Sequence, residues 1–88
     1  MSATRGRLQH LRPGVHRGNR QNHDRILAVV RGRVHVMLQQ GESVARASLR
    51  ASDAVAIPAC TPFSIEALQD TEIYLYADRT AQPALWGV

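Results

Sequence analysis

Short apolar stretches separated by turn residues recur along the chain, and this spacing constrains the fold more than any other feature. Residues 26–31 form a largely β-branched apolar stretch that stops at Gly32, and residues 33–38 then alternate between polar and apolar side chains. Alternation with a period of two is typical of a β-strand with one buried face. Two such strands that meet at a glycine predict a hairpin.

The same pattern continues toward the C-terminus. Further strands are predicted at 44–49, 54–58, 62–67 and 72–77, with turn residues between them. In the first of these, Val44, Ala45 and Leu49 supply the apolar side chains. The second ends at Pro58, because proline has no N–H to donate to a sheet. Six short strands at intervals of about 8–12 residues predict an all-β barrel or sandwich. No segment has a sustained helical period, which argues against a helix-turn-helix DNA-binding domain.

The length of 88 residues suits one small domain. A chain of this size buries only about 60–65% of the surface that its unfolded form exposes, so its core is thin and dimerisation would supplement it. No apolar run approaches the roughly 18 residues that are needed to span a bilayer. The single cysteine, Cys60, excludes an internal disulfide and a cysteine-rich zinc site. We therefore expect a cytoplasmic protein that forms a homodimer and has no membrane association.

Positive charge is concentrated near the N-terminus. Residues 1–25 contain six of the eleven arginines and a single acidic residue, together with glycines, a proline and no strand or helix period. We predict that residues 1–20 form an irregular, arginine-rich arm, loosely structured or facing a dimer partner. Residues 21–80 are expected to form the barrel. Residues 81–88 would form a C-terminal tail whose Trp86 folds back onto the barrel or a partner chain.

The basic arm also suggests a nucleic-acid partner as an alternative. Clustered arginines attract phosphates without sequence specificity. Specific binding to single strands normally adds aromatic side chains that stack on the bases, and residues 1–25 contain none. A solvated or dimer-facing arm is therefore preferred over a nucleic-acid-binding one.

Residues 52–63, with the sequence SDAVAIPACTPF, resemble the second conserved motif of the cupin family. That motif places a glycine, usually an aspartate, then a proline, a second glycine and a metal-binding histidine at fixed spacing. The aligned residues here are Ser52, Asp53, Pro58, Cys60 and Phe63. The resemblance implies a small cupin-like antiparallel β-barrel of the jelly-roll type, with a phenylalanine at the histidine position.

The hairpin around Gly32 is similar to the end of the first cupin motif, in which a glutamate stands seven residues before the glycine. That position is Arg25 in this chain. The His-x-His pair that precedes the glutamate in the family corresponds to Asn19 and Gln21, or to the residues one place earlier in the alternative register. The resemblance covers residues 12–79, yet all four metal-ligand positions differ from those of the family.

These substitutions predict a protein without a metal or other cofactor. Arg25 would bring a permanent positive charge to the metal position, and Phe63 has no donor atom. The alternative is a divalent metal in a rebuilt site formed by His16, His23 and His35, because three neutral imidazoles suffice for a catalytic zinc. No two histidines have local ligand spacing, and His35 lies on the polar face of its strand. Solvated histidines are therefore preferred.

The residues expected to line a metal-free barrel form the candidate ligand-binding site. They are Asn19, Gln21, Arg25, Phe63, Tyr74 and Tyr76. Arg25 would offer a planar pair of donors to a carboxylate or phosphate, and Phe63 would form an apolar floor. One alternative is that Phe63 only fills the barrel. Another is that Arg25 is exposed and paired with Asp24 or Glu72. The two tyrosines would equally suit a dimer interface.

Two residues of the 52–63 stretch are assigned structural roles. Cys60 has no neighbouring base in the sequence, so we expect a small buried residue rather than a nucleophile. Asp53 is expected to close a turn by accepting hydrogen bonds from nearby backbone N–H groups.

The fold alone does not select a function, because the cupin family includes isomerases, dioxygenases, storage proteins and sensory domains. The preferred hypothesis is a non-enzymatic, metal-free domain that binds a small molecule or serves for dimerisation. One alternative is a small cupin enzyme of the isomerase or oxygenase type, with a rebuilt histidine metal site or without metal. A second alternative is a nucleic-acid or protein binder that acts through the basic arm.

Overall fold

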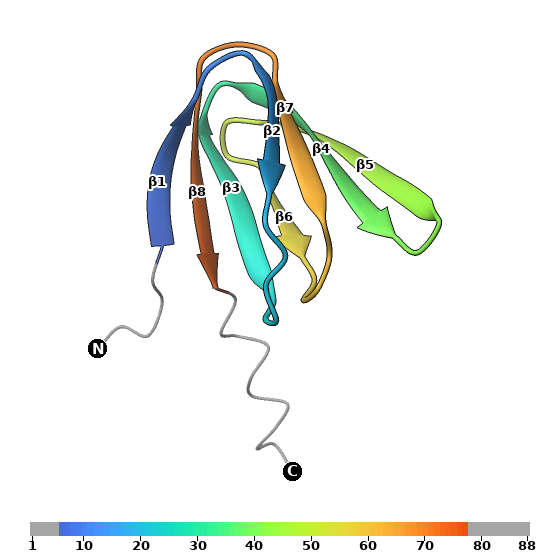
Figure 1. The fold of residues 1–88 in the computed structure, drawn as a ribbon. Helices are drawn as coiled ribbons and strands as arrows, with labels where there is room; N and C mark the ends of the chain where they lie inside the picture. The colour runs from blue at the N-terminus through green and yellow to red at the C-terminus, as the bar shows by residue number, and fades with distance from the viewer. Residues whose placement is uncertain (1–5, 78–88) are drawn as a thin grey trace, which may run out of the picture.

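A computed structural model describes residues 6–77, which fold into eight β-strands (Figure 1). In chain order these are β1 (Gly6–Leu11), β2 (Gly14–Gly18), β3 (Arg25–Arg31), β4 (Arg33–Gln40), β5 (Ser43–Arg50), β6 (Ala54–Ile57), β7 (Phe63–Ala67) and β8 (Thr71–Ala77). They form two four-stranded sheets, with the strand orders β1-β8-β3-β6 and β2-β7-β4-β5. Every pair of neighbouring strands is antiparallel. The arrangement is a jelly roll, and the predicted all-β fold class is confirmed. Within the described residues there is no helix long and apolar enough to cross a membrane.

The core lies between the two sheets. Alternate residues of the central strands β3, β4, β7 and β8 point into it, as the period of two requires. Three of them, Leu27, Val36 and Ile73, are completely buried, as is Ile57 at the end of the edge strand β6. Each fully buried aliphatic side chain contributes about 1.5–3 kcal/mol relative to an exposed one. The two strands expected on either side of Gly32 are present as β3 and β4. The hairpin predicted from them is wrong, because β3 pairs with β6 and β8 in one sheet and β4 pairs with β5 and β7 in the other, so the chain crosses between the sheets at Gly32.

The predicted irregular arm is wrong for the described part of residues 1–20. Residues 6–18 form the strands β1 and β2, which pair with β8 and β7 at the edges of the two sheets. The sequence did not indicate these strands because the inward positions of β1 begin with Arg7 and Gln9, which line a cavity rather than the apolar core. Residues 1–5 and 78–88, including the predicted tail at 81–88 with Trp86, lie outside the described residues.

One strand face also differs from expectation. On β5 the inward residues are Ala45, Ala47 and Leu49, which pack against or belong to the core. Val44 was grouped with them in the sequence but points outward and is 57% exposed. The three residues from Val44 to Arg46 include two adjacent apolar ones, so the alternation alone could not fix which of the two faces inward.

The loops of the 52–63 stretch have the backbone that the resemblance implies. Ser52 and Cys60 are the two non-glycine residues with positive φ in the described part of the chain, at 81° and 61°. They occupy the two positions that align with glycines of the cupin motif, and a positive φ is readily adopted only by glycine. The carboxylate of Asp53 accepts a hydrogen bond from the backbone N–H of Arg50 at 3.0 Å, which confirms its predicted role in closing a turn. Cys60 is exposed, so its predicted burial is wrong.

Candidate ligand-binding site

A cavity of about 350 Å³ lies between the two sheets, on the side where β1 and β2 form their edges. Its apolar wall consists of side chains from β1, β7 and β8, namely Leu11, Phe63, Ile65, Ile73 and Leu75. Its polar wall consists of Arg7, Gln9, His16, Arg17, Asn19, Gln21 and Arg25. The cavity therefore has one wall formed by side chains of the hydrophobic core and one wall formed by polar side chains.

Arg25 and Phe63 meet at one end of this cavity. Arg25 is the first residue of β3 and Phe63 the first residue of β7, and each is only 6% exposed. The guanidinium carbon of Arg25 lies 5.1 Å from the centroid of the Phe63 ring, within the range of a cation–π interaction. The two positions at which the resemblance would place a glutamate and a histidine are thus brought together, as the motif alignment predicts.

The guanidinium of Arg25 is only partly satisfied by the protein. One terminal nitrogen, Nη2, donates a hydrogen bond to the backbone carbonyl of Asn19 at 2.8 Å. The Nε atom is buried and has no partner within the described residues. Burial lowers the pKa of Arg25, because desolvation disfavours its charged form. An arginine nevertheless keeps its charge at neutral pH. The result is a buried cation with a donor that still lacks an acceptor.

The Phe63 ring depends on a glycine opposite it. Gly18 is the register partner of Phe63 in the β2–β7 pair. A Cβ atom on Gly18 would overlap the Phe63 ring, so any larger residue there would displace the ring from its place beside Arg25. The glycine at this position therefore allows the strand β2 to cover Phe63 closely.

The charge around the cavity is one-sided. Arg7 adds a second guanidinium group to that of Arg25, and no aspartate or glutamate is among the residues that line the cavity. Arg17 also borders the cavity, but it alternates with the inward His16 and Gly18 and its side chain belongs to the outer face of β2. Arg7 points inward from β1, two strands across the sheet from β3, in the row of Leu75 and Leu27. Cations that line a cavity without a carboxylate create a positive potential inside it. The apolar wall strengthens this potential, because apolar surroundings have a low dielectric constant and screen charge weakly.

His16 lines the same cavity and has a fixed orientation. Its ring nitrogen Nε2 donates a hydrogen bond to the backbone carbonyl of Arg12 at 2.7 Å. In the neutral ring this bond places the proton on Nε2 and leaves Nδ1 as an acceptor.

At the Arg25 end of the cavity, the loop between β2 and β3 is hydrogen-bonded to the loop between β6 and β7. Asp24 accepts a hydrogen bond from the backbone N–H of Ala59 at 2.8 Å. The backbone N–H of Cys60 donates to the carbonyl of Gln21 at 2.6 Å. The loop that carries Asn19 and Gln21 is thus attached to the loop after β6, which fixes the polar wall relative to Phe63.

The structure brings together four of the six residues predicted as ligand-binding. Asn19, Gln21, Arg25 and Phe63 line this cavity. Tyr74 and Tyr76 do not, because they alternate with Ile73 and Leu75 and lie on the outer face of β8, with their ring centroids 5.6 Å apart. Sequence reasoning missed Arg7, Gln9 and Arg17. The only signal for the first two was their period-two spacing with Leu11.

The alternative pairing of Arg25 with an acidic neighbour is wrong. Glu72 forms an ion pair with Arg31 at 3.3 Å, and Asp24 is engaged by the backbone of Ala59.

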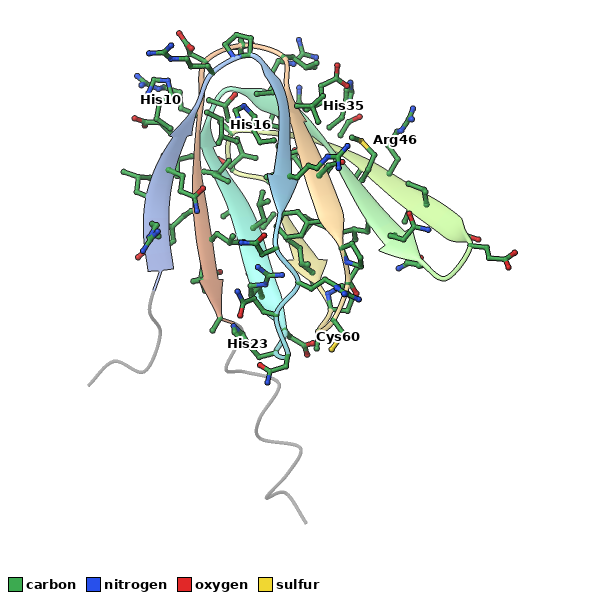
Figure 2. The ribbon with its side chains drawn as sticks, in the orientation of Figure 1. His10, His16, His23, His35, Arg46 and Cys60 are labelled. Carbon is green, nitrogen blue, oxygen red and sulfur yellow. The ribbon has the colours of Figure 1, made fainter. Side chains whose placement is uncertain are left out.

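The histidines do not converge on a metal site. Figure 2 shows His16 near the β1–β2 turn and His23 at the opposite end of the molecule. His35 is on β4, in the same sheet as His16, but it faces outward whereas His16 faces the cavity. His35 Nδ1 lies 2.9 Å from the Ser48 hydroxyl on the outer face, as predicted for an outward histidine. No group of three His, Cys, Asp or Glu residues in the described part of the chain could hold a metal ion. At the four motif positions, a guanidinium, a phenyl ring and two amides do not fit a divalent cation.

No protein-family model and no curated protein matches the chain, whereas its structure is similar to several solved ones. A cupin-2 domain containing protein from Shewanella frigidimarina superposes with a TM-score of 0.71 and 16% identity, over 90% of this chain and 74% of that one. Hydroxypropylphosphonic acid epoxidase from S. wedmorenis gives a TM-score of 0.72 and 11% identity, over 86% of this chain and 44% of that one.

Oxalate decarboxylase from Bacillus subtilis, described with Mn(II) centres, gives a TM-score of 0.75 and 19% identity, over 85% of this chain. The chain spans less than half of the epoxidase and 21% of the decarboxylase. Identities this low establish the fold and not the activity. On the strand order, the two loop conformations and these superpositions, the chain has the cupin fold.

Proposed function

We propose that the chain binds a small organic anion in the cavity between its sheets, with Arg25 as the charged partner, and that it does so without a metal and without catalysing a reaction. The observation that carries this proposal is the state of Arg25. It is 6% exposed and its Nε has no partner among the described residues. A buried cation that lacks an acceptor is costly unless an anion joins it.

The cavity favours a carboxylate with a compact apolar group. Guanidinium groups bind carboxylates through paired, charge-assisted hydrogen bonds, and Nε is one of the donors that such a pair uses. The apolar wall of Ile65, Ile73 and Leu75 would contact the rest of the ligand. A volume of about 350 Å³ is near the lower end for ligand pockets. A short branched-chain or single-ring carboxylate is the class that fits.

Binding is favoured over catalysis by the chemistry of the lining. His16 is the one imidazole among the lining residues, and Nε2, one of its two nitrogens, donates a hydrogen bond to the Arg12 carbonyl. Isomerisation and hydrolysis normally use a positioned acid and base together. The enzyme alternative would need a second proton-transfer group beside His16, and the lining residues supply amides and guanidiniums instead.

The test is calorimetric titration of chelator-treated protein with matched pairs of ligands, such as benzoate with benzamide and 3-methylbutanoate with 3-methylbutanamide. We expect binding of the carboxylates only. Arg25→Met should weaken it by about 10- to 100-fold, the value of a hydrogen bond to a charged group. Arg46→Met, on the outer face of β5, is the control and should bind as the wild type does.

Equal affinity for acids and amides, or equal affinity of Arg25→Met and wild type, would contradict the proposal. Conversion of a bound carboxylate during prolonged incubation, followed by NMR, would favour the enzyme alternative.

A further inference from the structure

The two sheets of this jelly roll have outer faces of opposite character. On the β2-β7-β4-β5 sheet the outward residues are mostly charged or polar, including Arg17, His35, Arg46, Ser48, Arg50 and Glu66. This is the usual pattern for an antiparallel sheet with one face in water. The outer face of β1-β8-β3-β6 departs from it, although it is built from the same kind of strands.

That second outer face is apolar over most of its area. Its outward residues include Leu8, Ile26, Ala28, Val30, Ala54, Ala56, Tyr74 and Tyr76. Leu8 is 58% exposed, Val30 52% and Tyr74 37%. Strands that are apolar on both faces are typical of a sheet that is covered on both sides.

We infer that this face is the interface of a twofold-symmetric homodimer. The residues of its central row match a second copy of the same row. By register, Leu8 pairs with Tyr74, Tyr74 with Ala28, and Ala28 with Ala54. Two large side chains are thus followed by two alanines across the sheet.

Consider a twofold axis that runs parallel to the strands, between β8 and β3. It stacks the β1–β8 half of one copy, which has the large side chains, on the β3–β6 half of the other copy, which has the alanines. Leu8 then lies over the partner's Ala54, and Tyr74 lies over the partner's Ala28. Such self-complementarity is what an isologous interface requires, and it keeps the strands of the two stacked sheets nearly aligned.

The charges at the edge of the face agree with the same axis. Arg31 and Glu72 form an ion pair at 3.3 Å on β3 and β8, the two strands that flank the proposed axis. The rotation that places β8 over the partner's β3 brings Glu72 opposite the partner's Arg31. The twofold axis generates two such contacts, so an arginine of each copy would lie opposite a glutamate of the other.

The size of the face suits a modest dimer. Four strands spaced by about 4.8 Å, with three outward rows about 6.8 Å apart, give a face of roughly 400 Å² in projection. Side-chain relief raises the accessible area above this value, toward the roughly 600–1,000 Å² per partner that specific interfaces bury. The inference does not depend on the ligand proposed for the cavity.

The first test is sedimentation equilibrium of the full chain over a range of micromolar concentrations. We expect the mass of two chains. Leu8→Arg would place a charge opposite Ala54 and should raise the dissociation constant by at least about 100-fold. The control is Val44→Arg, since Val44 has nearly the same exposure but lies on the other sheet; this variant should remain dimeric. A monomeric wild type, or a Leu8→Arg variant that remains dimeric, would overturn the inference.

The second test uses the charges. Arg31→Glu and Glu72→Arg each place like charges across the axis, so each variant alone should dimerise weakly. A mixture of the two restores both contacts between chains while neither chain has its internal ion pair. Native mass spectrometry should therefore show heterodimers well in excess of the statistical half. A statistical mixture would exclude the proposed axis.

Discussion

The guanidinium carbon of Arg25 lies 5.1 Å from the centroid of the Phe63 ring, so the first residues of β3 and β7 meet between the two sheets. The ring stabilises the cation on one side, and the Asn19 carbonyl accepts one of its hydrogen bonds. Neither replaces the water that the buried Nε has lost. A protein that retains this arrangement accepts a cost to stability in exchange for a positively charged cavity.

Replacement of Arg25 by methionine should therefore stabilise the unliganded protein. Burial lowers the pKa of Arg25, so the fold disfavours the charged form relative to the unfolded chain. That penalty is present at every pH below the folded pKa and would be relieved only as the pH rises above it. We expect urea unfolding to give Arg25→Met about 1 kcal/mol or more of added stability, equally at pH 6 and pH 8.

Arg46→Met on the outer face of β5 is the control, and its unfolding free energy should change little. A loss of stability in Arg25→Met would show that the contacts with Phe63 and Asn19 outweigh the desolvation of the guanidinium.

A metal site should be recoverable at the four motif positions, because the structure places them around one cavity. We expect the combined variant Asn19→His, Gln21→His, Arg25→Glu and Phe63→His to bind one Mn²⁺ or Zn²⁺ per chain, since three imidazoles and a carboxylate suit these ions. Elemental mass spectrometry after dialysis measures the metal content.

The same variant with Arg25 retained is the control, and its guanidinium should repel the cation. Absence of metal from the full variant, with the fold intact by circular dichroism, would contradict the alignment of the first motif with residues 19–25.

The sequence predicted the parts of the fold that depend on turns and on alternation. Pro58 and Gly32 end strands for local steric reasons, so the strands around them were predicted correctly. The spacing within 52–63 also placed Phe63 beside Arg25, because the backbone of that stretch depends on the positive φ of Ser52 and Cys60 rather than on the lost ligands. These features are local and can be read from a few residues.

The sequence could not predict the strand faces on which polar side chains point inward or apolar side chains point outward. Arg7 and Gln9 point inward because they face a cavity, and this hides β1 from any pattern based on apolar alternation. Tyr74 and Tyr76 were assigned to the ligand site because β8 is apolar on both faces, so its pattern could not tell the inner residues from the outer ones. Only the pairing of β8 with β1 and β3 decides this.

Gly18 should tolerate no side chain while Phe63 is present. A Cβ atom at this position overlaps the ring, and overpacking of this kind typically costs about 1–3 kcal/mol. We expect Gly18→Ala to lower the unfolding free energy by that amount and to weaken carboxylate binding, because the ring would be displaced from its place beside Arg25.

Phe63→Leu shortens the side chain and should remove most of the penalty of Gly18→Ala. A double-mutant cycle measures the coupling between the two positions. Additive effects would show that Gly18 is required for another reason, such as the conformation of the loop that follows it.

Glycine should be preferred at positions 52 and 60, where the backbone has positive φ. Ser52 and Cys60 hold φ values of 81° and 61°, which a side chain with a Cβ atom adopts at a cost of roughly 1–2 kcal/mol. Glycine relieves this strain but loses about 0.5–1 kcal/mol more entropy on folding. We expect Ser52→Gly and Cys60→Gly each to stabilise the protein by up to about 1 kcal/mol in urea unfolding. The controls are Ala51→Gly and Ala59→Gly, at neighbouring positions without positive φ, and these should destabilise it. If all four variants lose stability to the same extent, the two loops do not have the glycine-like backbone that supports the motif alignment.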